Sequence, residues 1–184
     1  MEKPTEKPLT KNEVMKAEKP DLSGTIRETL ANSEADRFSG DDEQFIKFHG
    51  IYQQDDRDKR KTGKEYSVMV RTRQTGGIVP AAQYIVYDEL SGRFANGTLR
   101  ITSRQTFQFH GVAQRGIGSL IKGINDALSS TLATCGDVNR NVTAPSNPPV
   151  DHVAVQVDED AFSITRALLP SPRDLSTSRM PSSA

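Results

Sequence analysis

The segment TLRITSRQTFQFHG, residues 98–111, alternates two kinds of side chain and constrains the fold more than any other stretch. A period of two is the side-chain repeat of a β-strand. The even-numbered positions are cationic or hydrogen-bonding: Arg100, Thr102, Arg104, Thr106, Gln108 and His110. The odd-numbered positions are mostly apolar: Leu99, Ile101, Ser103, Gln105, Phe107 and Phe109. The segment therefore predicts a half-buried strand, with a bend or bulge at residues 103–105 because it is long for one strand.

The polar face of this predicted strand has an unusual composition. It carries two arginines, a histidine and a glutamine but no acidic residue, whereas a solvated strand face usually mixes Lys, Glu and Thr. One interpretation is an ordinary wet sheet face. The other is a platform for anions, because arginine presents a rigid fork of donors that fits carboxylates and phosphates. Alternation alone leaves both interpretations open.

The neighbouring segments predict an α+β fold. Tyr66, Val68 and Val70 share one face of a predicted strand at residues 66–73, and Pro80 suits the first turn of a helix at residues 80–91. Apolar residues at helical spacing predict further helices at residues 116–129 and 158–169. Residues 137–142 are predicted as a last strand. This order indicates a ferredoxin-like antiparallel sheet with its helices on one face and its other face open.

Composition limits the classes of function. Lys plus Arg and Asp plus Glu both number 24, and the zero net charge argues against a general nucleic-acid binder. No window is apolar enough to span a bilayer, and the start of the chain lacks a signal-peptide pattern, so we expect a cytoplasmic protein that binds no membrane. The single Cys135 excludes an internal disulfide and a four-thiolate iron–sulfur site within one copy of the chain.

Four blocks in order resemble the nitrite/sulfite reductase family. They are FHGIYQQDDRD at residues 48–58, VRTRQTGG at 70–77, TLRITSRQTFQFHG at 98–111 and LATCGDVNRNV at 132–142. The resemblance implies the ferredoxin-like half-domain of that family at residues 45–150. We expect an extended or disordered segment at residues 1–44, where Lys, Glu and Pro predominate, the start of a next domain at 151–169, and a disordered Ser/Pro-rich tail at 170–184.

The resemblance also implies roles for individual residues. Enzymes of the family reduce sulfite to sulfide with six electrons on siroheme, which is coupled through a cysteine thiolate to a 4Fe–4S cluster. By motif, Arg71 and Arg140 match the arginines near sulfite. Arg100 and Arg104 match residues that hold siroheme carboxylates, and Gln108 and His110 would line the macrocycle. Arg73 is interpreted as a solvated neighbour, and no residue of the chain is expected to bind a metal.

The chain departs from the family pattern near its end. The active-site lysines and the cluster cysteines of the family lie beyond the family-like part of the chain, and Cys135 is expected to be a small core residue. We therefore expect the N-terminal part of an assimilatory sulfite-reducing enzyme, truncated and inactive alone. The implied partners of the whole enzyme are sulfite, siroheme and an electron donor, which is either a flavoprotein or ferredoxin.

Two alternatives remain beside this interpretation. One is a fragment of a nitrite reductase, the close relative within the family. The other is an RNA-binding module, because RNA-recognition domains share this topology and place aromatic side chains on the open sheet face. Phe107 and Phe109 have the opposite parity to the arginines and should face the helices, which disfavours the RNA alternative.

Overall fold

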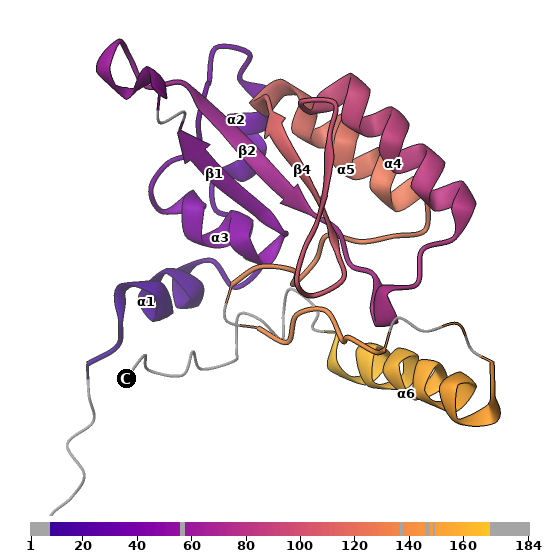
Figure 1. Cartoon of the computed structure of the whole chain (residues 1–184). Helices are drawn as coiled ribbons and strands as arrows, with labels where there is room; N and C mark the ends of the chain where they lie inside the picture. Colours follow the sequence, from indigo (N-terminus) through magenta and orange to yellow (C-terminus); the bar gives the residue numbers. More distant parts are fainter. Residues whose placement is uncertain (1–7, 56–57, 137, 146–147, 149, 170–184) are drawn as a thin grey trace, which may run out of the picture.

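Four antiparallel strands form one sheet in the order β1-β2-β4-β3 (Figure 1). The computed structural model describes residues 8–55, 58–136, 138–145, 148 and 150–169. The strands are β1 (Ile51–Asp55), β2 (Tyr66–Arg71), β3 (Leu99–Ile101) and β4 (Phe107–Val112). With helices beside this antiparallel sheet, the predicted α+β class is confirmed.

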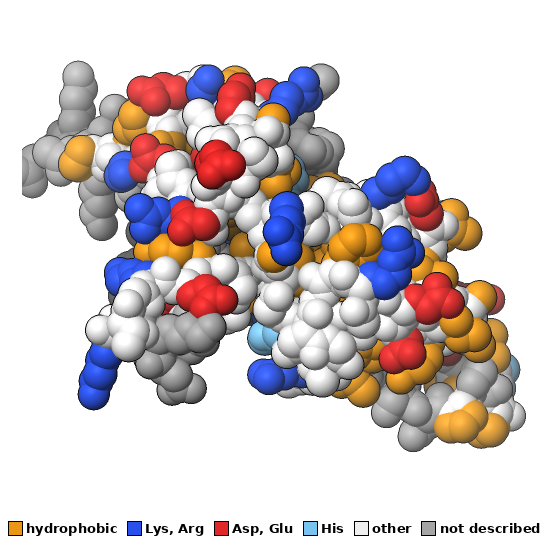
Figure 2. Space-filling view, turned by 90° about the horizontal axis from the view of Figure 1, so that it is seen from above, with side chains coloured by type: hydrophobic (Ala, Val, Ile, Leu, Met, Phe, Trp, Pro, Cys, Tyr) orange, Lys and Arg blue, Asp and Glu red, His pale blue; other side chains and the backbone are white. Residues whose placement is uncertain are grey.

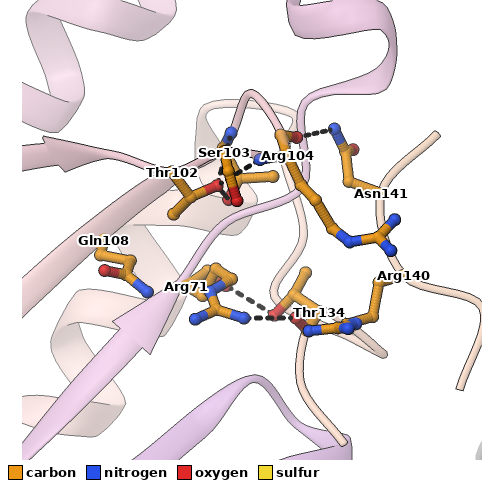
Figure 3. Close-up of a pocket in the computed structure, with 9 residues that line it drawn as sticks. Arg71, Thr102, Ser103, Arg104, Gln108, Thr134, Arg140 and Asn141 are labelled. Carbon is orange, nitrogen blue, oxygen red and sulfur yellow. Dashed lines mark hydrogen bonds between the residues drawn. The ribbon is translucent and has the colours of Figure 1, made fainter. Parts of the chain in front are cut away.

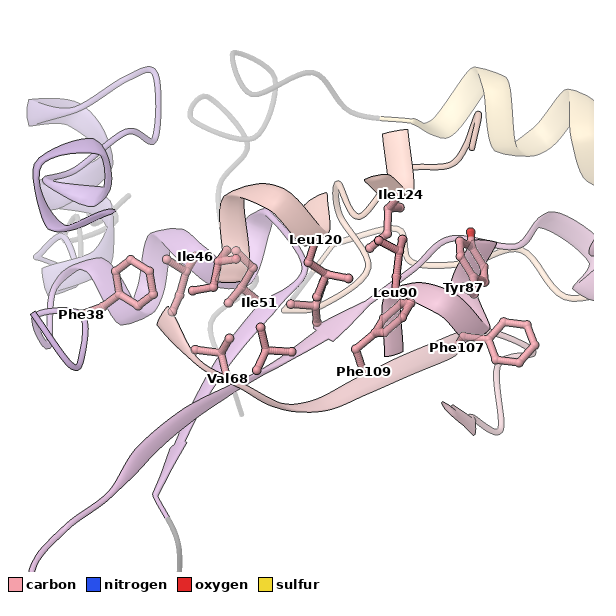
Figure 4. Close-up of a cluster of buried hydrophobic side chains, with 13 residues drawn as sticks. Phe38, Ile46, Ile51, Val68, Tyr87, Leu90, Phe107, Phe109, Leu120 and Ile124 are labelled. Atoms are coloured by element: carbon pink, nitrogen blue, oxygen red, sulfur yellow. The ribbon is translucent and has the colours of Figure 1, made fainter. Parts of the chain in front are cut away.

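Two helices, α4 (Ala81–Phe94) and α5 (Ile117–Asp126), lie together on one face of the sheet (Figure 1). Helix α5 lies within the predicted range 116–129, whereas α4 begins as predicted but continues three residues past the predicted end at residue 91. The side chains that fill the space between helices and sheet are the main core (Figure 4), and its fully or nearly fully buried members include Val70, Tyr87, Phe109, Leu120 and Ile124. The predicted parity of Phe107 and Phe109 is correct, because both rings pack against Tyr87 with centroids 5.8 Å apart.

Residues 98–111 form a hairpin, because the predicted bend at residues 103–105 is a full turn that splits the predicted strand in two. The amide of Thr102 donates to the carbonyl of Thr106 at 2.9 Å, and Gln105 adopts a φ of 57° in the turn. Strand β3 then pairs with β4 so that Arg100 lies opposite Gln108. Arg100 and Gln108 are an even number of residues apart in the sequence, so their side chains lie on the same face of the sheet although the chain reverses direction between them.

A bulge that the sequence does not predict interrupts the pairing of β4 with β2. Val70 pairs with Phe109 but Val68 pairs with Val112, so two residues of β4, His110 and Gly111, lie opposite one residue of β2. Gly111 has a φ of 69°, a conformation that a residue without a side chain adopts at little cost. The bulge reverses the parity of β4, which returns Val112 to the core.

The predicted strand at residues 137–142 is also wrong. Asp137 lies outside the described residues, and residues 138–142 form no strand. This segment is instead fixed to the end of the sheet by single contacts: the carbonyl of Val142 accepts from the amide of Gly76 at 2.9 Å, and the Gln105 side chain bonds both backbone groups of Ala144. One backbone amide and one side chain thus satisfy backbone groups that a strand would pair in a ladder.

The segments before and after the sheet are helical. Thr10 caps α1 (Lys11–Glu18) by accepting from the amide of Glu13 at 3.4 Å. A second apolar cluster joins α1 to α3 and consists of Met15, Leu22, Phe45 and Phe48. The remaining elements are α2 (Ile26–Ala31), α3 (Asp42–Phe48), α6 (His152–Leu168) and the short 3-10 helices η1 (Asp58–Lys61), η2 (Thr75–Gly77) and η3 (Gln114–Gly116).

Helix α6 begins six residues before its predicted start at residue 158, because the carboxylate of Asp151 caps it by accepting from the amide of Ala154 at 2.8 Å. The predicted domain divisions after residues 44, 150 and 169 stay predictions, and the predicted tail at 170–184 lies outside the described residues.

Acidic and basic side chains are interspersed over the surface that Figure 2 shows, in keeping with the zero net charge of the sequence. In the described part of the chain, no helix combines the length and the apolar character needed to cross a bilayer.

Two glycines of α5 offer a matched test of how closely the helices pack. A Cβ at Gly123 would lie 2.6 Å from Cδ2 of Leu90 on α4, whereas a Cβ at Gly118 would meet nothing within 4 Å. We expect Gly118→Ala to raise the free energy of unfolding by about 0.5–1 kcal/mol through helix propensity. The free energy of unfolding of Gly123→Ala should be about 1–3 kcal/mol lower than that of Gly118→Ala, because the added methyl group overpacks the interface between α4 and α5. Urea denaturation measures both, and equal midpoints would contradict the close contact.

Candidate anion-binding site

Three polar side chains lie in a row across the centre of the open sheet face. In the register of the sheet, Gln108 on β4 is opposite both Arg71 on β2 and Arg100 on β3. Val70 and Phe109, the neighbours of this row, point to the other face and are fully buried. The same alternation that fills the core therefore places one arginine on each side of the Gln108 amide.

A pocket of about 370 Å³ opens where β2 ends, between the β3–β4 turn and the loop that follows α5 (Figure 3). None of the nine residues that line it is acidic, and they are Arg71, Thr102, Ser103, Arg104, Thr106, Gln108, Thr134, Arg140 and Asn141. Among the described residues, Arg71, Arg104 and Arg140 form no ion pair. Their charges are left to attract an anion into the pocket.

Hydrogen bonds fix the guanidinium of Arg71. Its Nη1 donates to the carbonyl of Thr134 at 3.1 Å, and the hydroxyl of Thr134 donates back to the carbonyl of Arg71 at 3.0 Å. The Gln108 amide satisfies its neighbours when its oxygen accepts from Nε of Arg71 at 3.0 Å and its nitrogen donates to Nε2 of His110 at 3.1 Å. A held arginine binds an anion with little loss of side-chain entropy.

The surroundings of His110 favour the neutral form of its imidazole ring. Burial lowers its pKa from the ordinary 6.5, and the positive charges of Arg100 and Arg71 lower it further. A neutral imidazole leaves Nε2 free to accept the hydrogen bond from Gln108. The chain of contacts from His110 through Gln108 to Arg71 is therefore consistent in its donors and acceptors.

The structure brings four of the six sequence-predicted site residues into the pocket. Arg71, Arg104, Gln108 and Arg140 line it, whereas Arg100 and His110 do not. Arg100 is exposed on the edge strand β3, and His110 bonds Gln108, which lines the pocket.

Sequence reasoning missed several residues of the pocket. Thr134 and Asn141 stand in the LATCGDVNRNV block, where their side chains offered no pattern to single them out. Ser103 has odd parity, and a reading as one strand places it on the apolar face. The turn between β3 and β4 removes that constraint and lets Ser103 line the pocket.

The interpretation of Arg73 as a solvated neighbour is wrong. Arg73 is half-buried, and its guanidinium donates to the carbonyls of Leu132, Ala133, Asn139 and Arg140. Burial lowers its pKa from the ordinary 12.5. It therefore holds the loop that supplies one wall of the pocket.

The described residues hold no cluster of three or more His, Cys, Asp and Glu side chains that could bind a metal ion. Cys135 is fully buried, which raises the pKa of its thiol. It occupies the loop beside the pocket as a small core residue.

Comparison with known proteins gives consistent matches. Residues 58–127 match the nitrite/sulfite reductase ferredoxin-like half domain. The chain is 41% identical over 92% of its length to a sulfite reductase (NADPH) hemoprotein beta-component of Staphylococcus haemolyticus, and 44% identical over 90% to that of Chromohalobacter salexigens. It spans only 31% and 30% of those two proteins.

A solved structure shares the fold. The NirA protein of Mycobacterium tuberculosis superposes with a TM-score of 0.70 and 25% identity, over 90% of this chain and 33% of NirA.

The lowered pKa of His110 is open to direct measurement. We expect an NMR pH titration of its ring to give a midpoint below 6.5, and Arg100→Met to move that midpoint upward because a repelling charge is lost. The His110 ring takes up a proton more readily in the unfolded chain than in the folded one. The free energy of unfolding should therefore fall as the pH drops from 6.5 to the folded-state pKa of His110. Arg93→Met, on the exposed side of α4, is the matched control. A midpoint at or above 6.5 would contradict the described environment.

Proposed function

Because the chain belongs to the nitrite/sulfite reductase family through its half domain at residues 58–127, we propose that it is the N-terminal part of a sulfite reductase hemoprotein. The chain spans about a third of such proteins, so the whole enzyme needs a further part. The observation that carries the proposal is the acid-free pocket, in which three arginines without ion pairs among the described residues face one space.

Sulfite is the anion that we assign to this pocket. Arg71 is tethered by Thr134 and Gln108, and Arg140 reaches the pocket from the opposite wall. Two guanidinium groups on opposite sides could bind the oxygens of one small anion without either moving far. Fixed cations of this kind also stabilise negative charge as it develops on a bound anion.

Siroheme fits the same face by charge. Its carboxylates need cations, and Arg104 in the turn and Arg100 on β3 are exposed and form no ion pair among the described residues. Gln108 and His110 would line the macrocycle from β4. When bound, siroheme supplies the iron and the electron path for the six-electron reduction. A pocket of about 370 Å³ would take sulfite and one edge of the macrocycle, and the further part would enclose the rest.

The iron–sulfur cluster does not fit this chain. A 4Fe–4S cluster needs four thiolates, and Cys135 is a single buried thiol. We therefore assign the cluster ligands to the part of the relatives that this chain does not span. The name of those relatives includes NADPH, which favours an NADPH-linked flavoprotein over ferredoxin as the electron donor.

Nitrite is the alternative substrate. Nitrite also presents oxygens to guanidinium groups, and the half domain that residues 58–127 match is named for both nitrite and sulfite reductases. The charge of the pocket does not separate the two anions, so both belong in the same binding experiment.

Binding of the anion is the direct test. We expect sulfite, added at constant ionic strength, to produce saturable shifts in the NMR amide signals of Ser103, Arg104 and Thr134. Arg71→Met or Arg140→Met should weaken the affinity about tenfold, the loss of one charge-assisted hydrogen bond. Arg93→Met, on α4 at the far face, should leave it unchanged. Nitrite is titrated in parallel. Shifts that never saturate, or equal affinities for all variants, would refute the site.

The chain alone should not reduce sulfite. A 4Fe–4S cluster needs four thiolate ligands and the chain has one cysteine, so no cluster is bound that could pass electrons to the anion. The purified chain is incubated with siroheme, sulfite and a chemical reductant, and sulfide is measured against a protein-free control. Turnover above the control would overturn the assignment of the cluster to the part of the relatives that this chain does not span.

A further inference from the structure

The loop that forms the second wall of the pocket has little regular structure of its own. Between α5 and Val142, the described residues contain turns and bends but no helix or strand. This loop nevertheless presents Thr134, Arg140 and Asn141 to the pocket. Something outside the loop must therefore fix its backbone.

Arg73 makes the densest set of contacts to that loop. Its Nη2 donates to the carbonyls of Leu132 at 3.1 Å, Ala133 at 3.0 Å and Asn139 at 3.4 Å, and Nη1 donates to the carbonyl of Arg140 at 3.1 Å. Its Nε adds a longer bond to Leu132 at 3.4 Å. One guanidinium thus joins the two ends of the segment 132–140.

We propose that Arg73 is a positioning residue that sets the anion affinity of the pocket through Arg140 and Thr134, without contacting the anion. This deepens the proposed function and rests on it. Arg73 does not line the pocket, and its donors point to backbone carbonyls instead. The main chain of Arg73 supports the same loop, because its amide donates to the carbonyl of Ser130 at 2.8 Å.

Lysine cannot replace this clamp. The planar guanidinium reaches four carbonyls with donors in a fixed fork, whereas an ammonium group is a point charge with three donors. Arg73→Lys therefore keeps the positive charge near the pocket and removes the geometry. The variant separates positioning from long-range electrostatics.

The test is a double-mutant cycle read out by the sulfite titration. We expect Arg73→Lys to weaken sulfite binding about tenfold, close to the effect of Arg140→Met. The double variant should bind no more than about twofold more weakly than Arg140→Met alone, because most of the effect of Arg73 passes through Arg140 and the remainder through Thr134. Arg93→Lys is the matched control and should bind like the wild type.

The outcomes separate the two proposals. No saturable response in the wild type would refute the proposed function. Saturable binding that Arg73→Lys leaves unchanged, or effects of the two substitutions that multiply fully, would refute the role of Arg73 alone.

A measurement on the wild type keeps the proposal testable if the variant unfolds. In the arginine side-chain NMR spectrum, the Nε–H of Arg73 should exchange slowly and stay in place when sulfite is added, while those of Arg71 and Arg140 move. An Arg73 signal that exchanges as fast as that of exposed Arg93, or shifts as far as that of Arg140, would overturn the proposal.

Discussion

The antiparallel pairing of β2 with β4 is the interaction on which both the core and the site depend. One pair in this ladder, Val70 with Phe109, is fully buried under the helices, and the next, Arg71 with Gln108, faces the pocket. A slip by one residue would exchange the two faces, so every core contact that holds the register also holds the arginine in place. The bulge at Gly111 confines the change of parity to the far end of β4.

A buried polar network joins this ladder to the pocket. The Gln74 side chain is buried and donates to the hydroxyl of Tyr87 at 2.7 Å, within the core that α4 covers. Its backbone bonds the amide of Asn141, which in turn donates to the carbonyl of Arg104 at 2.8 Å. These hydrogen bonds join the three segments that carry the pocket arginines. A buried polar network whose donors and acceptors are all satisfied favours one arrangement of the segments that it joins.

The sequence could predict what depends on periodicity and not what depends on long-range side-chain contacts. Parity placed Arg71 and Gln108 on the polar face and Phe107 and Phe109 on the core face, because a strand has only two sides. The same parity said nothing of Arg140, whose loop has no repeat. It also left Arg73 looking like a solvated neighbour, since the carbonyls it bonds lie up to 67 residues away in the chain.

The two walls of the pocket are also made at different times. Arg71 and Thr134, which bond each other directly, are 63 residues apart. At a synthesis rate of about 5–20 residues per second, β2 leaves the ribosome roughly 3–13 s before the residue that tethers its arginine exists. During that interval the ladder can form only after β4 arrives, and the guanidinium groups of β2 stay hydrated. Assembly of the pocket is thus a late event in the biogenesis of the chain, and it follows rather than guides the formation of the sheet.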